Sequence, residues 1–245
     1  RYLLPYAKKI FVSHKELEGI SEKHQEKIYE IGNIIRKEIF NFQIKQNFNQ
    51  HEKELKILVL GGSQAAKIFA EKGIHIICDK PLALSSEEAI ELKNIVENNE
   101  IIFALTHNYT GYPMVRHARS LIKKNELGSL RVIQAEYPQD WLTTKVEDSG
   151  LKQAEWRTDP KRSGGGGCIG DIGTHAFNLI RFITGLEVDE LSADIHTFVK
   201  GRLVDDNAQI MLRFKGGAKG TIWSSQVAVG NENNLKIRIF GENGG

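Results

Sequence analysis

The sequence predicts an α/β protein: a partial Rossmann-like parallel sheet unit, followed by an α+β domain with a mainly antiparallel sheet. Two observations carry this prediction. Between residues 55 and 109, three short apolar runs alternate with two helical patterns, and that order is typical of a parallel sheet with right-handed crossovers. Between residues 191 and 240, four strand-like runs follow one another across short polar turns, which favours antiparallel pairing.

The elements of the first half follow from local patterns. Residues 14–50 carry Ile and Phe at helical spacings, which predicts helix with an interruption at Gly32 and Asn33. The next helix is closed by Gly73, and a later one opens with a capping box from Ser85 to Glu88. In chain order we expect a strand at 55–62, a helix at 63–73, a strand at 74–81, a helix at 85–99 and a strand at 101–109.

The second half changes pattern after residue 109. A long polar loop is expected between the first strand and a glycine run, and the last four strands alternate apolar with polar residues in several places. Such alternation predicts a sheet with one face on helices and the other free for a partner. We expect helices at 112–128 and 171–185, and strands at 129–137, 191–199, 207–214, 220–229 and 235–240.

The composition narrows the function classes. A formal charge of +2 over 245 residues gives no indication of nucleic-acid binding. The two cysteines, Cys78 and Cys168, lie in no C-x-x-C pair, so we expect small buried residues, no metal site and a reducing cytoplasm. No apolar run is long enough to span a membrane, and no leader pattern is present. The chain begins at Arg1 and stops at Gly245 just after a strand, so we expect a possible fragment.

The strongest local signal is "SGGGGCIGDIGTHAFNLIRF", residues 163–182. A glycine run before a helix lets the backbone approach a neighbour closely and leaves first-turn amides for a ligand. Asp171 and His175 are four residues apart, so both project from one face, where a carboxylate can orient an imidazole for acid/base work. The alternative is that Asp171 is an N-cap and His175 a satisfied structural histidine.

Lys80 adds to this signal. It follows a predicted parallel strand, between Asp79 and Pro81, at the sheet edge where α/β proteins bind ligands. The alternative is a solvated lysine at the end of a strand.

These motifs together resemble the Gfo/Idh/MocA family of NAD(P)-dependent sugar and polyol oxidoreductases. The resemblance rests on "GIHIICDKPLA" and "WRTDPKRSGGGG…GDIGTHAFNLIRF", and extends from about Gly73 to Gly245. It implies that Lys80 contacts both nicotinamide and substrate, that His175 is the acid/base on the hydroxyl being oxidised, and that Asp171 is its partner.

Other residues have two interpretations each. Asn108 and Tyr109 are placed to bind a polyol, although Tyr109 could instead be a wedge between domains. Trp156 and Arg157 resemble a family segment that lines the site, although Arg157 could instead hold a loop. We interpret His107 and His117 as structural or exposed, residues 205–207 as a turn, and Trp223 as a packing or interface residue.

The first part of the chain resembles a different family. "YLLPYAKKIFVS", "IGNIIRKEI" and "LKILVLGGSQAA" are similar to the N-acetylglucosaminyl transferase that acts on lipid I. That resemblance places Gly32, Asn33 and Arg36 after a hinge, and Gly61, Gly62, Ser63 and Gln64 against a UDP-sugar. The G-x-G-x-x-G fingerprint of a dinucleotide site is absent from the stretch before Asp79, where the Gfo/Idh/MocA resemblance would place it.

The sequence therefore predicts three segments: a glycosyltransferase-like segment at 1–72, the remainder of a nucleotide-binding unit at 73–109, and a substrate or oligomerisation domain at 110–245. The leading hypothesis is a cytoplasmic oxidoreductase that uses NAD or NADP on a sugar, inositol or related polyol, with a possible homo-oligomer through the C-terminal sheet. Its cofactor would contact Lys80, Pro81 and, in part, Gly61, Gly62 and Ser63. The alternatives are a UDP-N-acetylglucosamine-dependent transferase, or a non-enzymatic remnant of a fused gene.

Overall fold

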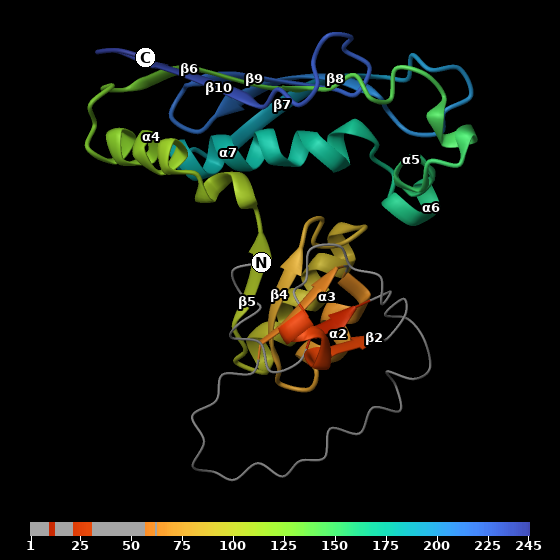
Figure 1. Ribbon diagram of the computed structural model, residues 1–245. Helices are drawn as coiled ribbons and strands as arrows, with labels where there is room; N and C mark the ends of the chain where they lie inside the picture. The colour runs from red at the N-terminus through yellow and green to blue at the C-terminus, as the bar shows by residue number, and fades with distance from the viewer. Residues whose placement is uncertain (1–9, 13–21, 31–56, 62) are drawn as a thin grey trace.

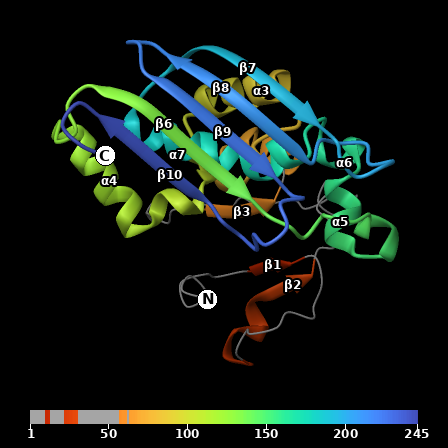
Figure 2. The same ribbon diagram turned by 90° about the horizontal axis from the view of Figure 1, so that it is seen from above.

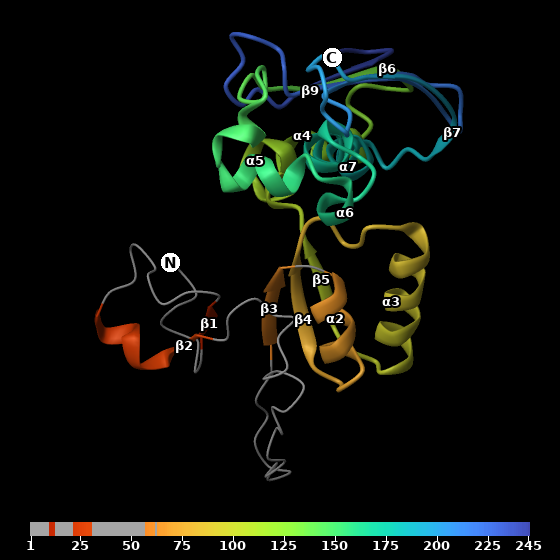
Figure 3. The ribbon, with the colours of Figure 1, turned by 90° about the vertical axis from the view of Figure 1, so that its right-hand side faces the viewer.

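The computed structural model describes residues 10–12, 22–30, 57–61 and 63–245, and most of them form two layered units (Figure 1). The first unit is a three-stranded parallel sheet in the order β3-β4-β5, and its two helices lie on one face (Figure 3). The element bounds are β3 (Ile57–Gly61), α2 (Ser63–Ala70), β4 (His75–Asp79), α3 (Ser86–Asn98) and β5 (Phe103–Thr106).

The predicted strand–helix order of this unit is confirmed. Burial drives its assembly, since Ala66, Ile76, Cys78 and Leu92 are all at most 3% exposed and form one apolar core. The predicted cap is present as well, because Ser85 accepts a hydrogen bond from the backbone amide of Glu88. Because β3, β4 and β5 are parallel, all three strands end at the same edge of the sheet, and this edge faces the second unit.

A separate parallel pair joins β1 (Ile10–Val12) to β2 (Ile28–Glu30), with the 3-10 helix η1 (Glu22–Lys27) just before β2. The predicted helix is wrong at residues 28–30, where a short run with Ile and Tyr pairs with β1 instead. Gly32, Asn33, Arg36 and Gly62 lie outside the described residues.

The second unit is a five-stranded sheet in the order β10-β6-β9-β8-β7, covered on one face by two helices (Figures 1 and 2). Most neighbours are antiparallel as expected, but β6 and β9 pair in parallel, so the sheet is mixed. The bounds are α4 (Pro113–Lys123), β6 (Leu130–Pro138), α7 (Thr174–Thr184), β7 (Val188–His196), β8 (Asn207–Phe214), β9 (Lys219–Ser225) and β10 (Lys236–Gly241).

Helix α7 is the centre of this unit. Ala176 and Ile180 are fully buried against alternate residues of the sheet, including Ile133 and Ile222. The inward faces of the strands are apolar and the outward faces are more polar, as the alternating sequence predicts. The helices therefore lie between the large sheet and the first unit, and the start of α7 comes close to the sheet edge of that unit.

The segment predicted as a polar loop contains three short helices. They are η3 (Val146–Ser149), α5 (Lys152–Arg157) and α6 (Pro160–Ser163). Helix α6 is set by local chemistry, since Pro160 occupies its first position and Asp159 accepts a hydrogen bond from the amide of Lys161. These turns are too short for a helical periodicity to show in the sequence.

Within the described ranges, no helix is long and apolar enough to cross a membrane. Over the same ranges, no group of three or more His, Cys, Asp or Glu side chains could hold a metal ion.

Candidate active site

The helix that carries the predicted site residues begins in an unusual way. A π-helical turn, η4 (Ile169–Gly173), precedes α7, and its first amides are bound by a carboxylate from a distant turn. Asp205 accepts hydrogen bonds from the amides of Gly167 (2.6 Å) and Ile169 (2.9 Å), and from the thiol of Cys168 (3.0 Å). Asp205, and not Asp171, is therefore the capping group of this helix.

The glycine run has a structural explanation at Gly167. A Cβ atom at this position would lie 2.0 Å from the carbonyl oxygen of Asp205, so only glycine fits. The close approach that we predicted for a ligand is made by the protein's own backbone.

Because Asp205 caps the helix, the Asp171 carboxylate is not needed as a cap and points into the interior of the site. Its oxygens accept hydrogen bonds from Lys80 Nζ (2.9 Å), Arg157 Nε (3.1 Å) and Gln226 Nε2 (2.9 Å). Lys80 Nζ also donates to the backbone carbonyl of Asp171, at 2.5 Å. The carboxylate thus joins the end of β4 in the first unit to the start of α7 in the second.

No hydrogen bond joins Asp171 to His175 among the described contacts, so the carboxylate does not orient the imidazole through such a bond. The carboxylate already has three donors, two of which are cations. Burial, together with the charge of Lys80 and the neighbouring His107, lowers the pKa of His175 to about 4, although Asp171 acts in the opposite direction. The imidazole is therefore neutral at pH 7.

Aromatic side chains hold the His175 ring. Tyr109 packs edge-on against it at 4.9 Å between ring centroids, and His107 does so at 6.0 Å. The Tyr109 hydroxyl lies 2.6 Å from that of Tyr137, which donates to Asn233. His107, which we interpreted as structural or exposed, therefore belongs to the surroundings of His175, and its Nδ1 atom is buried without a hydrogen-bond partner among the described residues.

A cavity of about 250 Å³ opens beside these groups. Lys80, Asp171 and His175 all line it, so the structure brings the three predicted catalytic residues together although Lys80 and Asp171 are 91 positions apart. Arg157 also lines it, with its guanidinium over the ring of Trp156 at 4.2 Å.

The other predicted residues do not line this cavity. The side chains of Asn108 and Pro81 are exposed. The ring of Trp156 stacks against the guanidinium of Arg157, and Tyr109 packs against His175. Gly61 ends β3 and Ser63 begins α2, at the strand–helix turn expected for a phosphate. The residues predicted as a turn at 205–207 do more than that, since Asp205 caps a helix and Asn207 belongs to β8.

Sequence reasoning missed part of the cavity wall. Gln139 and Trp141 follow β6, and Gln153 lies on α5. Gln226, which follows β9, does not line the cavity but donates a hydrogen bond to Asp171. One signal was available, because Gln139 comes directly after the end of β6 and Trp141 two residues later. No periodicity marks the other two.

The arrangement has a definite chemical capacity. A neutral imidazole can accept a proton, and an ammonium group beside it can donate a hydrogen bond to the oxygen that loses that proton. Amide and indole groups around them, from Gln139, Gln153 and Trp141, suit a ligand with several hydroxyl groups.

Comparison with protein families gives matches over both units. Residues 115–245 match the GFO/IDH/MocA C-terminal domain, and residues 13–107 match the oxidoreductase family with an NAD-binding Rossmann fold. The second match includes most of the segment that we compared with a glycosyltransferase.

Curated relatives and solved structures agree with these matches. An uncharacterized oxidoreductase, YfiI, of Bacillus subtilis is 31% identical over 180 residues, covering 73% of this chain and 46% of its own length. The levoglucosan dehydrogenase of Pseudarthrobacter phenanthrenivorans is 30% identical over 205 residues, covering 74% and 51%. A crystal structure of an inositol dehydrogenase homolog from Azotobacter vinelandii, complexed with NAD+, matches with a TM-score of 0.72 at 30% identity, covering 75% of this chain and 49% of that one.

The chain spans about half the length of the curated relatives it matches. The family model nevertheless covers more than half of the chain, and the fold agrees with it. The chain belongs to the Gfo/Idh/MocA family of oxidoreductases.

Proposed function

We propose that this chain transfers a hydride between a nicotinamide cofactor, NAD or NADP, and a CH–OH group of a sugar, inositol or related polyol. The observation that carries the proposal is the convergence of Lys80, Asp171 and His175 on one cavity of about 250 Å³. The family match and the levoglucosan and inositol dehydrogenases among the similar proteins support it.

Each of the three residues has a role in the oxidation of an alcohol. The neutral imidazole of His175 takes the hydroxyl proton, and the ammonium of Lys80 stabilises the negative charge that develops on the oxygen. Asp171 holds that ammonium in place through the 2.9 Å ion pair. A nicotinamide cofactor, when bound, accepts the hydride that leaves the same carbon.

Several residues of this chain fit a nicotinamide cofactor. The ends of β3 and β4 lie side by side, so the turn after Gly61 and the side chain of Lys80 share one edge of the sheet. We propose that the backbone at Gly61, Gly62 and Ser63 receives the phosphates in part, and that Lys80 and Pro81 lie near the nicotinamide. Binding can be measured as the enhancement of NADH or NADPH fluorescence, and no change at millimolar cofactor would contradict this.

The decisive experiment is a panel of sugars and polyols, assayed by NADH or NADPH formation with wild type, His175→Asn and Lys80→Met. Both variants should lose about 100-fold or more in kcat/KM, as expected for a positioned acid/base group. His117 is an exposed histidine on α4, so His117→Asn is the matched control and should keep full activity. Equal rates for all four proteins would refute the assigned roles.

The glycosyltransferase resemblance leaves a second hypothesis for residues 1–72, namely a fused gene of two origins. The NAD-binding match over residues 13–107 favours the dehydrogenase reading of this segment. Thermal shift separates the two, since UDP-N-acetylglucosamine should stabilise a transferase and nicotinamide cofactors a dehydrogenase. Stabilisation by neither, with no turnover, would favour a non-enzymatic remnant.

We also propose a boundary near residue 110 between the two units, a cytoplasmic location, and self-association through the uncovered face of the large sheet. That face carries exposed side chains such as Met211 and Arg213. Light scattering after size-exclusion chromatography would give the oligomeric state, and a monomer would contradict the last proposal.

A further inference from the structure

A buried arginine outside the cavity ties together two segments that shape it. Arg202 lies in the loop between β7 and β8, and its side chain is fully buried. Glu147 binds its guanidinium at two points, with Nε to Oε1 at 2.9 Å and Nη2 to Oε2 at 3.0 Å. The remaining N–H groups donate to the carbonyls of Leu142 (2.9 Å) and Thr144 (3.0 Å) and to Asp206 Oδ2 (3.2 Å). All five N–H donors of the guanidinium are therefore used.

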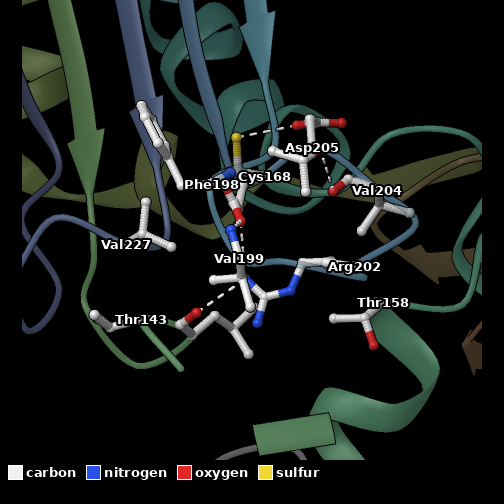
Figure 4. Close-up of polar contacts among 12 residues, drawn as sticks. Thr143, Thr158, Cys168, Phe198, Val199, Arg202, Val204, Asp205 and Val227 are labelled. Atoms are coloured by element: carbon white, nitrogen blue, oxygen red, sulfur yellow. Dashed lines mark hydrogen bonds and ion pairs between the residues drawn. The ribbon is translucent and has the colours of Figure 1, made fainter. Parts of the chain in front are cut away.

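Asp206 completes the anchor from the other side. Its side chain is also fully buried, and its oxygens accept hydrogen bonds from the amides of Phe198 (2.8 Å) and Val199 (3.0 Å). Its carbonyl accepts from the amide of Gln226, at 2.9 Å. Figure 4 shows Arg202 beside Val199, with Thr143 on the other side of Val199 in this view. We call Arg202, Asp206 and Glu147 the arginine anchor.

The arginine anchor fixes the segment that forms one wall of the cavity. Trp141 lies directly before Leu142, whose carbonyl is held by Arg202 and whose amide donates to the carbonyl of Gln226 at 3.1 Å. The indole nitrogen of Trp141 donates to Gln139, and both side chains line the cavity. The backbone directly after Trp141 is therefore held by Arg202 and Gln226, and its indole is held by Gln139.

A second route leads from the same turn to the catalytic carboxylate. Gln226, whose amide is held by Asp206, donates its side-chain N–H to Asp171 at 2.9 Å. Asp205, next to Asp206 in the chain, caps the helix that carries Asp171 and His175, and Figure 4 shows its carboxylate beside the Cys168 thiol. One short turn thus sets both the cavity wall and the helix.

We infer that Arg202 and Asp206 are positioning residues of the active site, which hold Trp141 and Gln139 in the orientation that a polyol requires. The inference rests on the proposed function, and it adds that recognition of the polyol depends on residues that do not touch it. Loss of the anchor should weaken binding of the polyol far more than binding of the cofactor, because Trp141 and Gln139 line the cavity beside His175, where we propose that the polyol binds.

The test compares Arg202→Lys and Glu147→Gln with Arg213→Lys. Lysine keeps the charge but cannot reproduce the five-donor fork of arginine. Arg213 has an ion pair with Glu190 in which both side chains are more than 60% exposed, so its replacement is a matched control. In Arg202→Lys, kcat/KM for the polyol should fall about 10-fold to 100-fold, mainly through KM, with the Kd of NADH within about twofold of wild type.

A direct probe of Trp141 separates positioning from stability. The sequence has three tryptophans, so 5-fluorotryptophan labelling gives three fluorine NMR signals, which Trp→Phe variants assign. The Trp141 signal should shift or broaden in Arg202→Lys and Glu147→Gln, well below their melting temperatures, and stay unchanged in Arg213→Lys. If Arg202→Lys does not fold, Glu147→Gln decides, since it weakens the two-point bond that fixes the guanidinium and so loosens the hydrogen bond from Arg202 to the Leu142 carbonyl.

The outcomes can be told apart. A lower melting temperature with unchanged KM and an unchanged Trp141 signal would overturn the inference, because the anchor would then be merely structural. If wild type oxidises no polyol, the proposed function fails, and the fluorine signal still shows whether the anchor positions Trp141. A moved signal supports the positioning role in that case, and an unmoved one refutes it.

Discussion

Replacing Asp171 with asparagine tests the central ion-pair network of the site. The carboxylate accepts three hydrogen bonds of 2.9–3.1 Å, and two of the donors are the cations Lys80 and Arg157. Asparagine has one acceptor oxygen, and its NH2 group would face one of the cations. At least one charged hydrogen bond is therefore lost, and such a bond contributes about 1.5–3 kcal/mol.

The expected loss in free energy of unfolding is about 2–3 kcal/mol, since the three side chains are only 16–23% exposed and solvent screens them little. Urea unfolding followed by tryptophan fluorescence measures it, provided that the m-value is unchanged. The control is Glu190→Gln, which removes a carboxylate from the exposed pair with Arg213 and should cost less than about 1 kcal/mol. If Asp171→Asn costs no more than Glu190→Gln, the network does not stabilise the fold and this reasoning is wrong.

Three further predictions concern glycine, histidine and cysteine. Gly167→Ala should lower the free energy of unfolding by about 3 kcal/mol, because its Cβ would overlap the Asp205 carbonyl. Gly165 has open space around it, so Gly165→Ala should lower it by less than about 0.5 kcal/mol. Equal urea midpoints for the two variants would contradict this. The pKa of His175 near 4 predicts constant imidazole NMR shifts from pH 8 to 5. Histidine in the unfolded chain binds a proton below about pH 6.5, whereas His175 in the native protein does so only near pH 4. The free energy of unfolding should therefore fall from pH 6.5 to pH 4 by up to about 3 kcal/mol more in wild type than in His175→Gln. Parallel curves of stability against pH for the two proteins would refute this. Burial raises the pKa of Cys168, so the native protein should not react with a thiol reagent at pH 8 and the urea-unfolded protein should; rapid native labelling would disprove the burial.

Much of the fold could be predicted because each element carries its own local signal. The alternation in β8, the capping box at Ser85 and the apolar run before Lys80 specify structure within a few residues, so these bounds agree with the structure to within about two residues. Strands β7 and β9 end three and four residues before their predicted ends. The parallel pairing of β6 with β9 could not be predicted, because those strands are about 80 residues apart and no local feature records which neighbour a strand takes. The strand at residues 28–30 was missed for a similar reason, since pairing with β1 overrides a helical spacing.

The site was predicted as a set of residues but not as a set of contacts. Lys80, Asp171 and His175 do converge on one cavity. The spacing of Asp171 and His175 predicted that the carboxylate would orient the imidazole. The carboxylate instead forms ion pairs with Lys80 and Arg157, because a cation competes for it more strongly than a neutral imidazole does. The capping role of Asp205 was hidden as well, since a carboxylate 36 positions away leaves no trace near the helix that it caps.

The bond between Lys80 and Asp171 also bears on how the site is assembled during synthesis. Lys80 leaves the ribosome 91 residues ahead of the carboxylate that fixes it, and Gln226 follows 55 residues after that carboxylate. A nascent chain can complete the small parallel sheet early, but its lysine lacks this carboxylate partner until residue 171 has emerged. Any pause in translation between these points leaves a folded first unit without a working site.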